Sequence, residues 1–300
     1  MRVSDALAVS ATGVRKTFGD AVVLDDADLR VPANDVTLLM GPNGAGKTIL
    51  LSCLCGALSP DDGDVEVLGR SPTEARTDLS FMIQGGLALP DLTGRENLEF
   101  YAGLHPRATD EWRDIVDWLD LDRDALDKPV RDYSGGMTRK LELAATLSVD
   151  VPLYLLDEPS AELDMTTIDR LHSYLRDLVD DGKTVVFTSH EPMDADIASH
   201  VAFVQHGERV AAGDPDALLA DVPRVLRVDG RRLVGDVSEF VRDGRLFEDG
   251  QERRGFLQDG ATVDLAKRTI PDDSNREKVA AADPTYADMF NYYTRVRSWD

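Results

Sequence analysis

The strongest constraint on this chain of 300 residues is one glycine-rich octapeptide, Gly41-Pro42-Asn43-Gly44-Ala45-Gly46-Lys47-Thr48. It satisfies the P-loop pattern, in which glycines let successive backbone N–H groups converge on phosphate oxygens at a helix N-terminus. An apolar run at residues 36–40 precedes it, and a periodic apolar segment at 47–58 follows. This order of buried strand, loop and helix is the setting that a phosphate-binding loop requires. We expect Lys47 to contact phosphate and Thr48 to bind Mg²⁺.

A second motif places two carboxylates after another apolar run. Asp157 and Glu158 directly follow residues 153–156. At the end of a buried strand, Asp157 could hold Mg²⁺, and Glu158 could orient and deprotonate an attacking water. An Asp-Glu pair in this position is, on its own, more often a solvated turn. Its occurrence in the same chain as the P-loop favours the catalytic interpretation.

The distribution of apolar residues predicts an α/β fold. Residues 7–31 alternate apolar and polar side chains over short runs, which indicates an antiparallel β edge. Residues 153–156 and 184–188 are further buried strands, and a helix over about 165–179 separates them, which favours a mostly parallel central sheet. Between about 91 and 149 the pattern predicts a helical insertion, with spacing i, i+3, i+4, i+7 at Trp112, Ile115, Val116 and Leu119.

Beyond residue 214 the pattern changes to short strand-like pieces, at 225–228, 245–247 and 261–265. Asp-Gly pairs that begin at 229, 243, 249 and 259 punctuate them, as turns do. The chain closes with a predicted helix capped by Asp283, with Pro284 at its first position. We therefore expect a P-loop domain at residues 1–219 and a small β-rich accessory domain at 220–300.

Composition limits the partners and the location. The formal net charge of −23 repels nucleic-acid phosphates and argues against a nucleic-acid partner. No apolar run approaches the ~20 residues needed to cross a bilayer, and the first ten residues show no export signal, so we expect a cytoplasmic location. Cys53 and Cys55 point to different faces of a predicted helix, which suits neither a disulfide nor a metal pair.

A third motif, Tyr133-Ser134-Gly135-Gly136-Met137, resembles the signature sequence that separates ABC ATPases from other P-loop proteins. The resemblance covers about residues 7–219. In that family two ATPase domains stack head to tail. The resemblance therefore implies that Ser134 and the amides of Gly135 and Gly136 grip the γ-phosphate of ATP held by the partner's P-loop.

Other family landmarks occur in the expected order. Phe18 resembles the aromatic residue that stacks on adenine, and Gln84 the glutamine that links Mg²⁺ and water to the membrane partner. His190 resembles the histidine that contacts the γ-phosphate. Each residue alone could be an ordinary core or surface residue, but the collinear set favours these roles. Glu162 departs from the family, which usually has glycine there, in the loop that crosses the dimer interface.

The resemblance implies an ATP-binding, Mg²⁺-dependent ATPase subunit that powers a transporter through a separate membrane-spanning permease. The active unit would be a homodimer or heterodimer of such subunits at the cytoplasmic face of the cell membrane. Met137 and residues 284–290 resemble the branch that serves drug, antibiotic or polysaccharide exporters. We also expect an exposed apolar groove near residues 87–93 for a short helix of the permease.

Two alternatives remain. A soluble ABC ATPase acting on ribosomes or DNA would usually carry two fused ATPase units or a long coiled-coil insertion, and neither is visible. A regulatory protein that holds ATP without turnover is disfavoured by the presence of Lys47, Asp157, Glu158 and His190.

Overall fold

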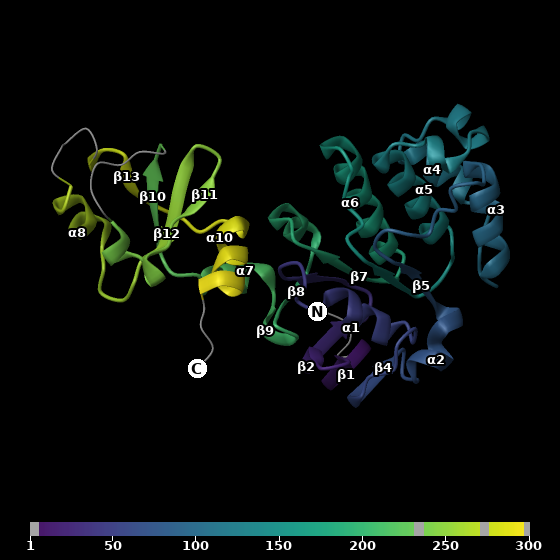
Figure 1. The fold of residues 1–300 in the computed structure, drawn as a ribbon, viewed down its shortest axis with the longest axis horizontal. Helices are drawn as coiled ribbons and strands as arrows, with labels where there is room; N and C mark the ends of the chain where they lie inside the picture. The colour runs from purple at the N-terminus through teal and green to yellow at the C-terminus, as the bar shows by residue number, and fades with distance from the viewer. Residues whose placement is uncertain (1–5, 231–236, 271–275, 297–300) are drawn as a thin grey trace. The chain divides into compact units, whose positions relative to one another are not determined.

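The computed structural model describes residues 6–230, 237–270 and 276–296 (Figure 1). The chain divides into two compact units, Met1–Ala211 and Ala212–Asp300. The expected boundary between residues 219 and 220 falls inside helix α7 (Pro215–Ala220), which belongs to the second unit. Within the described ranges, no helix has both the length and the apolar character needed to cross a bilayer.

A six-stranded sheet forms the centre of the first unit, in the order β5-β6-β7-β3-β8-β9. Strand β3 pairs in parallel with β7 and β8, and β6 pairs in parallel with β5 and β7. Every residue of β3, β6 and β7 is buried, which explains their uninterrupted apolar sequences. The predicted mostly parallel sheet is confirmed. Its strands are β5 (Leu79–Met82), β6 (Leu153–Leu156), β7 (Thr184–Ser189), β3 (Val36–Met40), β8 (His200–Gln205) and β9 (Glu208–Gly213).

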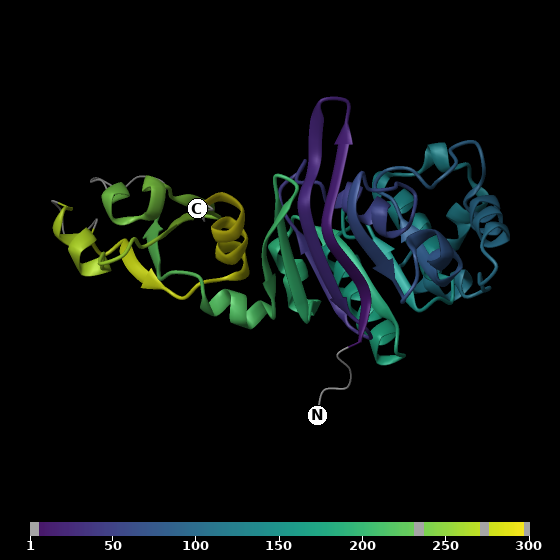
Figure 2. The same cartoon turned by 90° about the horizontal axis from the view of Figure 1, so that it is seen from below.

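A second sheet in this unit is antiparallel. Strand β1 (Leu7–Phe18) pairs with both β2 (Ala21–Pro32) and β4 (Asp62–Val67). Figure 2 shows β1 and β2 as two long neighbouring strands, drawn in purple. Gly19, in the turn between them, has φ of 60°, a left-handed conformation that glycine adopts readily. The antiparallel edge expected from residues 7–31 is therefore present, and β4 completes it.

Two helices follow strands of the central sheet. Helix α1 (Lys47–Leu54) begins at the last two residues of the P-loop and ends before the predicted residue 58. The chain turns at Gly56, which has φ of 71°, a conformation outside the right-handed helix. Helix α6 (Met165–Asp180) connects β6 to β7, and the side chain of its N-cap residue Asp164 accepts a hydrogen bond from the Thr167 amide. A short helix, α2 (Pro72–Ala75), leads toward β5.

The predicted helical insertion contains α3 (Gly94–Leu104), α4 (Trp112–Trp118) and α5 (Gly135–Leu147). The apolar face predicted for residues 112–119 is buried, as the spacing requires. Short 3₁₀ turns, Arg123–Asp127 and Val130–Asp132, lead into α5. Helix α5 therefore presents its N-terminus, which carries the signature sequence, at the end of this insertion.

The second unit is an antiparallel sheet with strand order β11-β12-β10-β13. Its strands are β11 (Phe247–Asp249), β12 (Glu252–Phe256), β10 (Val225–Asp229) and β13 (Val279–Ala282). The predicted turn at Asp249-Gly250 joins β11 to β12. The strand expected at residues 261–265 is wrong. Instead, α8 (Val263–Arg268) begins there because the Thr262 side chain accepts from the Leu265 amide, and Ala266 faces the core of the unit.

The final helix, α10 (Tyr286–Asn291), starts later than the sequence suggests. Its N-cap is Thr285, and the predicted cap Asp283 is wrong. Thr285 Oγ1 accepts from the Asp288 amide, and Asp288 Oδ2 accepts from the Thr285 amide at 2.9 Å, a reciprocal capping box. Asp288 also pairs with Arg254 of β12, Oδ2 to Nη2 at 2.7 Å, with both side chains buried. The helix is thereby fixed to the sheet of its own unit.

Candidate nucleotide-binding and hydrolysis site

The P-loop connects β3 to α1 in a conformation that requires glycine. Gly46 has φ of 101°, and a Cβ there would lie 2.9 Å from the Val23 carbonyl oxygen. Lys47 is buried, and its Nζ donates to the Gly41 carbonyl at 2.7 Å and the Pro42 carbonyl at 3.2 Å. Because the first amides of a helix have no partner within the helix, the N-terminus of α1 can donate to phosphate oxygens.

This loop opens onto a cavity of about 320 Å³. Gln84 and Glu158, which are distant in sequence, line the cavity together with the P-loop. The remaining lining residues are Val23 and the consecutive residues 43–49. The structure therefore brings the phosphate-binding candidates and the candidate base to one place, as the sequence motifs predict.

Asp157 lies at the end of β6 and has no exposed surface. Its Oδ1 accepts from Thr188 Oγ1 at 2.6 Å. Its Oδ2 is buried and has no hydrogen-bond partner among the described residues. An unpaired buried carboxylate oxygen is costly unless a cation or donor reaches it. The donor set of this carboxylate and the hydroxyl of Thr48 is the oxygen chemistry that Mg²⁺ prefers.

Three side chains converge on the Glu158 carboxylate. Gln84 Nε2 donates to Glu158 Oε2 at 2.6 Å, and His190 Nδ1 lies 3.3 Å from Oε1. Lys47 Nζ lies 4.0 Å from the same oxygen. Burial lowers the pKa of Lys47 below its ordinary value, and the attraction of Glu158 and Asp157 opposes that change. The ammonium group and the carboxylates are thus close enough to act on one bound phosphate and its attacking water.

Thr188, which sequence reasoning missed, holds both carboxylate residues in place. Its hydroxyl donates to Asp157 and accepts from the Glu158 amide at 2.8 Å. Glu158 has φ of 50°, an uncommon conformation for a residue other than glycine, and this hydrogen bond helps to fix it. The sequence gives no local sign of this role, because the contact forms only when β7 lies beside β6 in the sheet.

A buried trio fixes the loop that follows Glu158. Asp194 has no exposed surface and accepts from Ser160 Oγ at 2.8 Å. Its other carboxylate oxygen lies 2.7 Å from His172 Nε2 of α6. These contacts join the loop after β6 to the segment after His190. Both segments that carry candidate catalytic residues are therefore anchored to the same buried carboxylate.

The remaining predicted residues lie elsewhere. Ser134 is the N-cap of α5, and its Oγ accepts from the Met137 amide at 3.3 Å, with Gly135 and Gly136 in the first turn. Phe18 is 47% exposed at the end of β1. Within the described part of the chain, the cavity lining includes neither Phe18 nor the signature residues. Their predicted contacts with ATP stay predictions.

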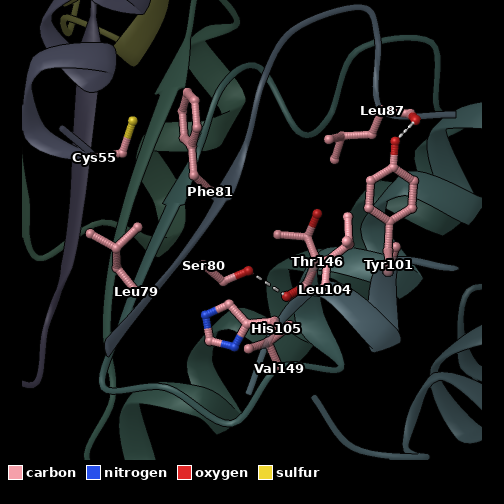
Figure 3. Close-up of a pocket in the computed structure, with 11 residues that line it drawn as sticks. Cys55, Leu79, Ser80, Phe81, Leu87, Tyr101, Leu104, His105, Thr146 and Val149 are labelled. Atoms are coloured by element: carbon pink, nitrogen blue, oxygen red, sulfur yellow. Dashed lines mark hydrogen bonds between the residues drawn. The ribbon is translucent and has the colours of Figure 1, made fainter. Parts of the chain in front are cut away.

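A second cavity, of about 280 Å³, lies near the place where an apolar groove was expected. Of the stretch 87–93, only Leu87 lines it, together with Phe81 of β5 and Leu104 of α3. Figure 3 shows these side chains around the cavity, with Tyr101 donating to the Leu87 carbonyl and Ser80 to the Thr146 carbonyl at 2.8 Å. Leu104 is 64% exposed, so the apolar wall is accessible.

Comparison with known proteins decides the family. Residues 24–161 match the family model described as ABC transporter. The daunorubicin resistance ATP-binding protein DrrA3 of Streptomyces coeruleorubidus is 37% identical, over 71% of this chain and 70% of that protein. The chain belongs to the ABC transporter ATP-binding family.

A further relative agrees with this assignment, and a solved structure shares the fold. The Nod factor export ATP-binding protein I of Sinorhizobium fredii is 36% identical to this ABC ATPase, over 89% of this chain and 81% of that protein. A solved ATP binding subunit of an ABC transporter superposes with a TM-score of 0.64 at 20% identity, over 71% of this chain and 92% of that one. The protein is thus an ATP-binding and ATP-hydrolysing subunit of an ABC transporter, and the ATP-hydrolysing function expected from its motifs is confirmed.

Proposed function

We propose that this ABC ATPase hydrolyses ATP in the cavity between the P-loop and Glu158 and thereby drives an exporter. The observation that carries the proposal is the convergence of Lys47, Gln84 and His190 on the Glu158 carboxylate. A general base must lie within hydrogen-bonding reach of the proton that it abstracts. Glu158 lines the same cavity as the P-loop, which supports its role as base for a water beside the bound phosphates.

Each residue of the site has a role that follows from its atoms. The P-loop amides and the Lys47 ammonium bind the phosphates, and Glu158 accepts a proton from the attacking water. Gln84 and His190 hold the Glu158 carboxylate and orient that water. Thr188 holds both Asp157 and Glu158 from the neighbouring strand.

Asp157 Oδ2, Thr48 and Gln84 are the groups that would hold Mg²⁺. When bound, the ion supplies positive charge to the phosphate oxygens during phosphoryl transfer. The unpaired, buried Oδ2 supports this assignment because a cation would satisfy it.

The signature residues act on the ATP of a second subunit. Ser134 and the first-turn amides of α5 lie outside the P-loop cavity, so a second ATPase subunit is needed to bring them to a γ-phosphate. The proposed active unit is a homodimer or heterodimer with two shared sites, in which Phe18 stacks on adenine. ATP closes the dimer and hydrolysis reopens it.

The permease contact lies at the cavity near Leu87. Its wall of Leu79, Leu87 and Leu104 suits the apolar face of a short helix. Such a contact supports the proposed location at the cytoplasmic face of the cell membrane. The relatives named for daunorubicin resistance and for Nod factor export support an exporter. The net charge of −23 disfavours nucleic acid as a partner.

The test is to tag the full chain in its native host, solubilise membranes in mild detergent and identify co-purifying proteins by mass spectrometry. We expect a stoichiometric partner with several membrane spans. Leu104→Glu should abolish its recovery because it places a charge on the apolar wall, whereas Leu7→Glu, on exposed β1, should not. Recovery with ribosomes, or of the chain alone, would refute the transporter assignment.

A further inference from the structure

Glu162 lies in the loop between Glu158 and α6 with φ of 65°, in the left-handed region that favours glycine. Its side chain reaches the first turn of α5. A Cβ added to Gly135 would clash with Glu162 Oε2, and one added to Gly136 would lie 2.9 Å from the Glu162 carbonyl oxygen. The loop therefore lies directly on the two signature glycines, and a carboxylate covers one of them.

The first turn of α5 attracts negative charge. Its leading amides have no partner within the helix, and the aligned peptide dipoles place partial positive charge there. Ser134 Oγ already accepts from the Met137 amide. Gly135 and Gly136 carry no side chains, so an anion can approach their backbone closely. Glu162 Oε2 lies where a Cβ on Gly135 would be, so one anionic side chain already lies beside this turn.

The same amides have a second use in the proposed function, where they meet the γ-phosphate of ATP bound to the other subunit. A phosphate and a carboxylate of like charge cannot both occupy this short turn without repulsion. Both Glu162 and Gly135 are exposed, so the carboxylate can move away into solvent.

We infer that Glu162 sets the ATP concentration at which two of these subunits close, because its carboxylate competes with the partner's γ-phosphate for the N-terminus of α5. The inference rests on the proposed head-to-tail dimer. Glu162 is a positioning residue, since it acts through Gly135 and Gly136 and contacts no reacting atom. A charge at a helix N-terminus changes an equilibrium by roughly two- to fivefold at each site.

The test measures ATP-driven dimer formation of the full chain. Glu158→Gln is used as the background because it blocks hydrolysis, and Mg-ATP is titrated while light scattering reports the dimer. Adding Glu162→Gln should lower the ATP concentration for half-maximal dimer formation roughly two- to tenfold, because each dimer holds two such contacts. Glu162→Gly should lower it at least as far, since it also removes the side chain and relieves the left-handed backbone.

Two controls separate this effect from a general one. Glu66→Gln removes an equally exposed carboxylate from β4 and should leave the titration unchanged. Binding of ADP to the monomer, which does not involve the first turn of α5, should be the same in all variants.

The inference would be overturned if Glu162→Gln left the ATP concentration for half-maximal dimer formation unchanged or raised it. It would also be overturned if the affinity of the monomer for ADP changed by the same factor. If the Glu158→Gln chain itself forms no dimer at saturating Mg-ATP, the proposed dimer fails, and this inference fails with it.

Discussion

Replacing Thr188 with valine is the sharpest test of how the fold supports hydrolysis. The substitution keeps the branched shape on β7 and removes one hydroxyl, which is fully buried. That hydroxyl donates to Asp157 Oδ1 at 2.6 Å and accepts from the Glu158 amide at 2.8 Å. Both residues of the Asp-Glu motif therefore lose a partner, while the side chain on β7 keeps its branched shape.

The size of the effect follows from those two contacts. A hydrogen bond to a charged group contributes about 1.5–3 kcal/mol, and a buried amide left unpaired costs about 1–3 kcal/mol. We expect the free energy of unfolding to fall by about 3–5 kcal/mol. Because Glu158 then loses the contact that fixes its backbone, we expect kcat to fall roughly 10- to 100-fold, with a smaller change in KM for ATP.

A matched control lies on the same strand. Thr184 is also buried, and its Oγ1 accepts from the Asn34 amide at 2.9 Å, away from the carboxylates. Thr184→Val should lower stability by about 1–3 kcal/mol and leave kcat within about twofold. The assay is steady-state ATPase activity with a Mg²⁺ titration, beside chemical denaturation. Equal kcat values for the two variants would refute the positioning role of Thr188.

Four further results are expected. Glu158→Gln should cut turnover on the order of 100-fold or more while ATP still binds, so near-normal turnover would reject the assigned base. Lys47→Ala should weaken ATP binding in a direct titration, because it removes the phosphate cation. Asp288→Asn should lower the stability of the second unit by about 1.5–3 kcal/mol, since it removes the charge 2.7 Å from the buried Arg254 guanidinium and leaves only Asp249 and Glu252, each at 3.9 Å. Hydrogen exchange of the β10 and β12 amides measures this loss of stability. Asp259→Asn should have little effect, because the Asp259 side chain that pairs with Arg242 is 97% exposed. Burial raises the pKa of the Cys53 thiol to about 11, so iodoacetamide at pH 8 should alkylate it much faster in denaturant than in the native protein.

Local sequence determined much of the fold. The P-loop, the Asp-Glu pair and the buried strands were predictable because each signal spans a few consecutive residues. The periodic face at residues 112–119 was equally clear. The predictions of secondary structure were wrong where one helix-capping residue determines whether, or where, a helix begins. Thr262 starts a helix where short apolar spacing suggested a strand, and the box formed by Thr285 and Asp288 overrides the Asp283-Pro284 signal.

Contacts between distant segments were beyond the sequence. The roles of Thr188 and Asp194 depend on which strands and loops are neighbours in space, and no local spacing encodes that. Glu162 was visible as a departure from the family pattern, but its approach to Gly135 follows only from the packed loop. The predicted roles of Phe18 and the signature residues stay predictions, because their contacts would come from bound ATP or another subunit.

The strand order of the second unit has a consequence for protein synthesis. Strand β10 is a central strand, and one of its two neighbours, β13, follows it in the chain only after β11, β12 and α8. The Asp288 carboxylate that neutralises buried Arg254 is made later still. Until β13 leaves the ribosome, β10 has an open edge, and until Asp288 leaves it, Arg254 lacks its nearest counter-charge. The sheet of this unit can therefore be completed only after its last strand is made, whereas the strands of the first unit's central sheet are by then already available to pair.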